Sequence, residues 1–181
     1  MRVIAGSLKG RRLKAPSWEG LRPTSDRLRE TLFNIHAPRA GGARVMDGYA
    51  GTGALGIEAM SRGAASVAFV ERDRRAQALL EENLAHCGLT NGYVIIRASV
   101  ARAIDDFRKT LSSFDLILLD PPYDEAADEV VGAAGALLAQ DGVLVLEHAR
   151  RRPVAASAGR LARTRQVISG DSALSFYSCL P

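Results

Sequence analysis

The segment Asp120-Pro121-Pro122-Tyr123 combines residue types that suit the handling of a planar amine, and it follows an apolar run, Phe114 to Leu119. The Asp120 carboxylate can accept a hydrogen bond from an exocyclic N–H group. Two successive prolines fix φ and remove N–H donors, so that a backbone carbonyl can serve as the second acceptor. Tyr123 offers a flat face on which a base can stack. The segment predicts a catalytic clamp for the N-methylation of a base; an ordinary turn is the alternative.

A second set of residues has the pattern of a nucleoside site. Asp47 is expected at a strand end and is followed by Gly51, Gly53 and Gly56 in a Gly-x-Gly-x-x-Gly arrangement. Such a turn lets the backbone pass close to a ligand at a helix N-terminus. Glu71 ends the next expected strand, where a carboxylate can accept both hydroxyls of a ribose. These residues predict a nucleoside-containing cofactor; a tight strand–helix turn without a ligand is the alternative.

Two features favour S-adenosyl-L-methionine (SAM), with S-adenosyl-L-homocysteine (SAH) as its product, over a dinucleotide. Asp47 would lie close to a pyrophosphate, which it would repel, whereas the ammonium group of SAM suits an acid. The clamp, moreover, has no role in hydride transfer. Methyl transfer by direct in-line displacement depends mostly on positioning and desolvation, and it needs no metal.

The elements that must position these residues alternate along the chain. Five apolar segments read as strands, at residues 43–47, 66–71, 93–97, 114–120 and 142–147. Helical patterns separate them, at residues 54–62, 73–87, 99–109 and 125–139. This alternation predicts an α/β fold with a parallel sheet covered on both faces. Residues 162–178 read as two strands joined by a Ser-Gly-Asp-Ser turn, which predicts a closing antiparallel hairpin.

The first 40 residues form a basic unit ahead of the main body at 41–181. Residues 1–16 read as a hairpin around Gly6 and Gly10. A helix with an apolar stripe follows, which Thr24 or Ser25 can cap and which has Asp26 in its first turn. Residues 1–44 hold ten Lys/Arg against three acids, and residues 148–165 hold six Arg and no acid. Basic ends on a small domain suggest a nucleic-acid partner; a solvated surface is the alternative.

Composition excludes several classes of protein. With 47% hydrophobic residues the chain can bury a core, yet no apolar run approaches the ~18 residues of a membrane span. The N-terminus lacks the apolar core of a signal peptide. Cys87 and Cys179 are too far apart in the sequence to indicate a disulfide scaffold, so a cytoplasmic protein is expected. His86 and Cys87 indicate a helix end rather than a metal site.

The sequence resembles the RsmD family, the 16S rRNA guanine-N2 methyltransferases. The segments that carry the resemblance are "MRVIAGSLKGRRL", "RPTSDRLRETLFN", "AGTGALGIEAMSRGA", "FVERD", "DPPY", "VLEH" and "SGDSALSFY", in the family's order. The resemblance implies a Rossmann-like, seven-stranded class I SAM-methyltransferase sheet with an antiparallel last strand. It also implies methylation of N2 of one guanine in 16S rRNA of the small ribosomal subunit, usually guanine 966, by a cytoplasmic monomer without metal or membrane.

Roles follow from the resemblance at the matching positions. It implies that the target base is held by Asp120, Pro121, Pro122 and Tyr123. It implies cofactor contacts for Asp47, Gly51, Thr52, Gly53, Glu71, Arg72, Ser99, Thr24 and Asp26. It implies RNA contacts for Arg2, Lys9, Arg11, Arg12, Lys14, Arg22 and Arg27, which supply affinity rather than sequence choice.

The chain departs from the family pattern at three places. It has "DGYAGTG" where "DLFAGSG" is common, and we expect Gly48 and Tyr49 to alter packing more than chemistry. Ser99 stands where many SAM enzymes have an acid for the adenine amine. The unusually basic residues 148–152 indicate either a further RNA contact or a solvated surface.

Other functions remain open at this point. A DNA adenine-N6 methyltransferase shares the clamp, but the chain leaves little room for a DNA-reading domain. A NAD-dependent dehydrogenase is a less favoured interpretation. A non-catalytic RNA-binding module is disfavoured because Asp47, Glu71 and the clamp are all intact. The clamp by itself does not distinguish guanine from adenine.

Overall fold

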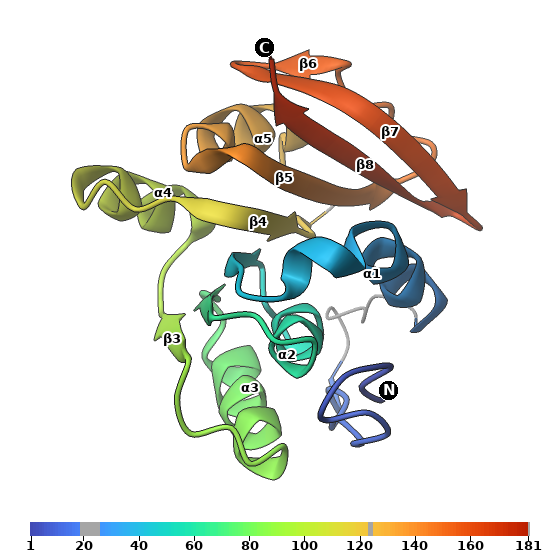
Figure 1. Ribbon diagram of the computed structural model, residues 1–181, viewed down its shortest axis with the longest axis vertical. Coiled ribbons are helices and arrows are strands. Elements are labelled where there is room, and N and C mark those ends of the chain that lie inside the picture. Colours follow the sequence, from blue (N-terminus) through green and yellow to red (C-terminus); the bar gives the residue numbers. More distant parts are fainter. Residues whose placement is uncertain (19–25, 123–124, 181) are drawn as a thin grey trace.

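The computed structural model describes residues 1–18, 26–122 and 125–180. Its sheet consists of β1 (Arg44–Gly48), β2 (Ser66–Val70), β3 (Tyr93–Ile96), β4 (Phe114–Leu119), β5 (Leu138–Ala149), β6 (Ser157–Ala158), β7 (Leu161–Ser169) and β8 (Ser172–Cys179). The strands lie in the order β3-β2-β1-β4-β5-β8-β7-β6 (Figure 1). The first five strands along the chain run parallel, and β8 pairs antiparallel with β5.

Helices cover both faces of this sheet. The helices α1 (Asp26–Ala40), α2 (Ala54–Ser61) and α3 (Arg74–His86) share a core with one face, through residues such as Val45 of β1. The helices α4 (Val100–Lys109) and α5 (Ala127–Gly135) pack on the other face, where Met46 points. Because side chains alternate along a strand, Asp47 belongs to the α2 face. The predicted α/β architecture with a parallel, doubly covered sheet is confirmed.

The sheet has one strand more than the seven that the resemblance implies. The additional strand, β6, has two residues and pairs antiparallel with Leu161 and Ala162 at the start of β7. The turn between β6 and β7 contains Gly159 at φ 59°, a left-handed conformation that glycine adopts without strain. The antiparallel last strand is confirmed.

One boundary differs from the prediction. The helix expected over 125–139 ends at Gly135, and the strand expected from residue 142 begins at Leu138. Phe114 of β4 pairs with Leu138, and its N–H donates to the Leu137 carbonyl at 2.9 Å. The register then shifts before Leu116. The apolar residues around 137 fit a helix face as well as a buried strand, and tertiary pairing decides between them.

The N-terminal hairpin is present, in a short form. Arg2 and Arg12 form a single antiparallel bridge, and the Val3 N–H donates to the Arg11 carbonyl at 2.9 Å. Val3 and Leu13 are buried in the same core as α1 and α2. The residues proposed to cap α1, Thr24 and Ser25, lie outside the described residues.

The described residues were also compared with the requirements of a membrane span, a metal site and a disulfide. Among the described residues, no helix is long and apolar enough to cross a membrane. Within the same residues, no group of three or more His, Cys, Asp or Glu side chains is arranged to hold a metal ion. Cys87 and Cys179 are both free, and Cys87 caps the C-terminus of α3, as the helix-end reading predicts.

Candidate cofactor and substrate site

Two buried carboxylates organise the turn between β1 and α2. Asp47 accepts a hydrogen bond from the Gly56 N–H at 2.8 Å. Glu71, at the end of β2, accepts from the Gly51 N–H at 2.9 Å and from the Asp73 N–H at 2.8 Å. Three of the predicted cofactor residues, Asp47, Gly51 and Glu71, therefore meet at the carboxyl ends of two adjacent parallel strands, where open α/β sheets bind ligands.

Helix α3 supports this turn through two buried amides. The Gln77 side chain donates to the Glu71 carbonyl at 2.7 Å, and the Asn83 side chain donates to the Thr52 carbonyl at 2.9 Å. Sequence reasoning did not single out either residue. The signal was present, because both are polar positions on the buried side of α3. Their amides hold the backbone that carries the predicted contacts.

The charges in the turn decide which ligand it suits. Burial raises the pKa of Asp47 to about 8; the hydrogen bond from Gly56 opposes this shift, and the nearby charge of Glu71 adds to it. The N–H groups of Gly51 and Gly56 could otherwise donate hydrogen bonds to a phosphate. Here they donate to carboxylates of the protein itself. A pyrophosphate would meet two acids here, whereas a cationic group and ribose hydroxyls would meet acceptors. The residues present therefore fit SAM and not a dinucleotide.

The glycines of the turn are also needed for packing. A Cβ at Gly53 would lie 2.3 Å from Leu80, and one at Gly56 would lie 2.2 Å from the Phe69 ring. At Gly48, the departure from the family pattern, a Cβ would lie 2.7 Å from the Leu119 side chain. A larger residue at 48 would require the Leu119 side chain, just before the clamp, to move.

Strand pairing brings the predicted clamp beside this turn. Gly48 of β1 pairs with Leu119 of β4, so Asp120 emerges next to the β1–α2 turn. The Glu125 N–H donates to the Pro122 carbonyl at 3.0 Å. Tyr123, the predicted stacking residue, lies outside the described residues. The described part of the clamp is thus adjacent to the turn between β1 and α2, which we call the cofactor turn.

Tyr49 connects the two loops directly. Its hydroxyl donates to Glu125 Oε1 at 2.6 Å, and its φ of 64° is unusual for a residue other than glycine. Burial, followed by the hydrogen bond and charge of Glu125, raises the pKa of Tyr49, while the charge of Arg72 acts in the opposite direction. The expectation that position 49 mainly affects packing omitted this contact, which ties the cofactor turn to the segment after the clamp.

Several predicted cofactor residues have structural partners. The Ser99 hydroxyl accepts from the Arg102 N–H at 3.3 Å and so caps α4. Asp26, in the first turn of α1, pairs with the buried Arg29 at 2.6 Å. Arg72 is exposed. Thr24 lies outside the described residues.

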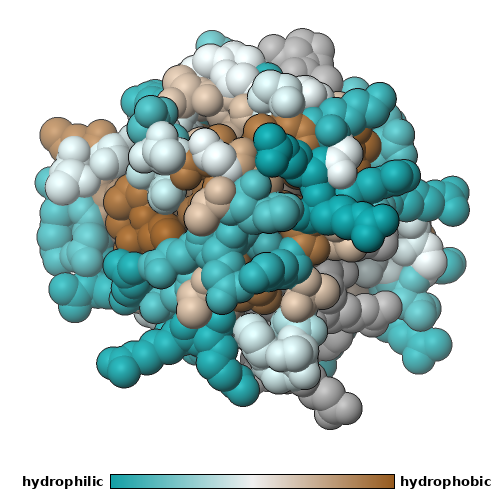
Figure 2. All heavy atoms as spheres, turned by 90° about the horizontal axis from the view of Figure 1, so that it is seen from below, coloured by the Kyte–Doolittle hydropathy of each residue, from teal (hydrophilic) through white to brown (hydrophobic). Residues whose placement is uncertain are grey.

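The predicted RNA-binding residues are mostly exposed on the hairpin. Those with exposed side chains are Arg2, Lys9, Arg11, Arg12, Lys14 and Arg27. Lys14 pairs with Glu82 at 2.9 Å, and Arg22 lies outside the described residues. Figure 2 views the molecule from the lower end of Figure 1, where the N-terminus and α3 lie, and this surface is mostly hydrophilic.

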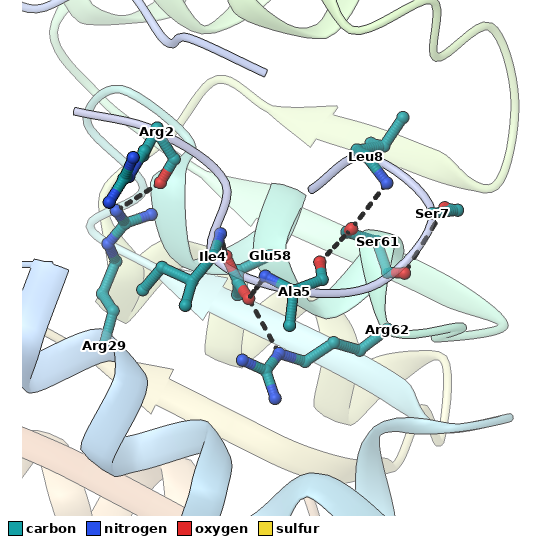
Figure 3. A network of polar contacts seen from close by, with 9 residues as sticks. All are labelled: Arg2, Ile4, Ala5, Ser7, Leu8, Arg29, Glu58, Ser61 and Arg62. Atoms are coloured by element: carbon teal, nitrogen blue, oxygen red, sulfur yellow. Dashed lines mark hydrogen bonds and ion pairs between the residues drawn. The ribbon is translucent and has the colours of Figure 1, made fainter. Parts of the chain in front are cut away.

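A polar network fixes the hairpin to α2 (Figure 3). The buried Glu58 carboxylate accepts from the N–H groups of Ile4 at 2.8 Å and Ala5 at 3.0 Å, and also from Arg62 Nε at 2.8 Å. The Ser61 hydroxyl accepts from the Leu8 N–H at 2.9 Å. The basic hairpin is therefore held in a defined position against the domain.

Comparisons with known proteins identify the family of this chain. The family described as Conserved hypothetical protein 95 matches residues 1–178. The chain belongs to this family. The resemblance to RsmD is also confirmed, because the chain is 41% identical to Ribosomal RNA small subunit methyltransferase D of Haemophilus influenzae over 128 residues. That alignment covers 68% of this chain and 64% of the relative.

Two further likenesses extend over almost the whole chain. It is 38% identical to YlbH of Bacillus subtilis, with 98% of both chains covered. The solved structure of yhhF from Escherichia coli superimposes with a TM-score of 0.85 at 27% identity, covering 100% of this chain and 98% of that one. A more distant structure, SMU.776, was solved in complex with SAH; at 14% identity and a TM-score of 0.70 it establishes the fold alone.

Proposed function

We propose that this RsmD-family protein transfers a methyl group from SAM to the exocyclic N2 of one guanine in 16S rRNA of the small ribosomal subunit. The observation that carries the proposal is the pairing of β1 with β4. It places the Asp47–Glu71 turn, which fits SAM, beside the Asp120 clamp, which fits a planar amine. The relative from Haemophilus influenzae, named for small-subunit rRNA methylation, supports the same substrate class.

Each side chain has a simple task in this reaction. Glu71 accepts the ribose hydroxyls, Asp47 accepts a hydrogen bond from the ammonium group, whose positive charge favours ionisation of this acid, and Asp120 accepts an N2–H of the guanine. SAM, when bound, supplies an electrophilic methyl group. The guanine nitrogen would take this methyl group by direct displacement with release of SAH, while Asp120 holds the amine in position. The N2 proton leaves along the hydrogen bond to Asp120.

The hairpin supplies the RNA affinity in this proposal. Lys9, Arg11 and Arg12 are exposed on a segment whose backbone is held by Glu58 and Ser61. A positioned set of cations contacts phosphates without reading sequence.

The test is mass-spectrometric mapping of rRNA from cells that lack this gene and are complemented with either wild type or Asp120→Ala. We expect one N2-methylguanine, at the position that corresponds to guanine 966, to disappear without the gene and to return with wild type only. Purified Asp120→Ala should lose roughly 100-fold or more in methyl transfer, because a transition-state acceptor is removed. Its SAM binding by calorimetry should be unchanged. Normal turnover by this variant would reject the clamp.

A further inference from the structure

A pocket of about 330 Å³ opens beside the clamp. Its walls are the clamp prolines Pro121 and Pro122, the start of α5, the end of β5 at Glu147, and the loop at Pro153. Its volume is at the lower end of the range for small-molecule sites, which suits one flipped nucleobase.

The walls of the pocket are fixed by hydrogen bonds. His148 contacts the Ser175 hydroxyl through Nε2 at 2.9 Å and the Arg152 carbonyl through Nδ1 at 3.0 Å. On the opposite side, the Ala155 N–H donates to Asp128 at 2.9 Å, which joins the loop after β5 to α5. A pocket whose walls are held in this way is formed before its ligand arrives.

The carboxylates that line the pocket differ in their roles. Glu125 accepts from Tyr49, and Asp128 accepts from the Ala155 N–H. Glu129 is exposed in the first turn of α5. Glu147 is partly buried and follows Leu146, which pairs with Leu119 immediately before Asp120. Glu147 and Asp120 therefore emerge side by side from adjacent parallel strands.

The hydrogen-bonding edges of the bases decide which one suits two neighbouring acceptors. Guanine presents two adjacent donors, N1–H and the N2 amine, on its Watson–Crick edge. Adenine presents an acceptor, N1, beside its amine, and cytosine likewise presents N3. A carboxylate facing that position would attract the guanine N1–H and repel the lone pairs of the other two bases.

The geometry points to Glu147 as the residue that selects guanine: its carboxylate accepts the N1–H while Asp120 accepts N2–H. This inference rests on the proposed function and adds the base discrimination that the clamp lacks. In this arrangement Glu147 contacts the Watson–Crick edge of the guanine at N1, next to the N2 nitrogen that is methylated.

The test replaces the target guanine with 2-aminopurine, which keeps the 2-amine but presents N1 as an acceptor. Small-subunit rRNA is ligated from two transcripts with either base at the mapped position and assembled into particles. Wild type should prefer guanine in kcat/KM by about 10-fold to 100-fold, the range for a hydrogen bond to a charged group. In Glu147→Gln this preference should fall about tenfold or more, because an amide can donate to N1 of 2-aminopurine.

The matched control is Glu129→Gln, which removes the same charge from the exposed rim of the pocket and should keep the preference of wild type. If Glu147→Gln methylates guanine with an unchanged preference, the inference is overturned and the proposed function stands. If wild type methylates no guanine in the particle, the proposed function fails and the inference with it. Circular dichroism and SAM calorimetry identify a variant that is misfolded; Glu147→Asp, which keeps the charge on a shorter side chain, then provides the second test of the same ratio.

Discussion

Asp47 combines burial with a second acid nearby, and this combination makes its protonation part of folding. Its pKa is about 8 in the folded chain against a usual value of 3.8. Between these two values the folded state holds a proton that the unfolded state does not. The stability contributed by this group is therefore fully present below pH 4 and is lost as the pH rises through 8. The turn becomes less stable as its acid ionises.

Replacing this acid should remove that pH dependence. Asp47→Asn keeps an acceptor for the Gly56 N–H and has no charge to bury. The free energy of unfolding of the variant, relative to wild type, should rise between pH 5 and pH 8 by at most about 1.4 kcal/mol per pH unit. Urea titrations at four pH values measure this difference. A difference that stays constant with pH would show that Asp47 is already ionised.

At the scale of elements, the short helix α2 supports two separate parts of the molecule. Nearly all of its residues are buried, and the glycine turn leads into its N-terminus. Its last turns carry Glu58 and Ser61, which accept backbone N–H groups from the hairpin more than 50 residues away in sequence. One helix therefore positions both the cofactor turn and the proposed RNA-binding hairpin.

Weakening this anchor should release the hairpin. Glu58→Gln replaces one carboxylate oxygen by an NH2 group, which cannot accept a hydrogen bond, so either the bond from Ile4 or those from Ala5 and Arg62 are lost. We expect the free energy of unfolding to fall by roughly 2 kcal/mol or more, because hydrogen bonds to a buried charge are broken. Hydrogen exchange should show faster exchange at the amides of Ile4 and Ala5. Glu82→Gln, which removes an exposed ion pair with Lys14, should change stability by less than ~1 kcal/mol.

The elements were predictable where local pattern and tertiary environment agree. The alternation of apolar strands and amphipathic helices identified β1 to β4, and the acids at strand ends predicted that the turn between β1 and α2 is the candidate cofactor site. Residues near Leu138 satisfied two patterns, so only the pairing with Phe114 could place the start of β5. Contacts such as Tyr49 with Glu125 join segments 76 residues apart, and no local signal encodes such a partner.

At the scale of the whole molecule, the two basic segments contribute exposed cationic side chains at different places. Lys9, Arg11 and Arg12 are exposed on the hairpin, held by α2. Arg150 and Arg151 are exposed at the end of β5, next to residues that line the pocket beside the clamp. A polyanion that enters the pocket would therefore pass the second basic segment.

The salt dependence of RNA binding should separate these contributions. Arg150→Ala with Arg151→Ala should weaken binding to small-subunit rRNA particles and lower the slope of log K against log salt by roughly 1 to 2. Arg108→Ala, which removes an exposed cation from α4, should leave that slope unchanged. Filter binding at four salt concentrations measures both. An unaltered slope in the double variant would identify residues 150–151 as solvated surface.

The position of β8 has a consequence for biosynthesis. Among the described strands it is the last along the chain, yet it lies between β5 and β7 in the sheet. During translation β5 keeps an open hydrogen-bonding edge, and β7 has no partner toward the centre of the sheet, until residues 172–179 have emerged. Unpaired strand edges promote association between chains. This protein therefore completes its sheet in one late step, and it depends on that step being fast relative to encounters with other nascent chains.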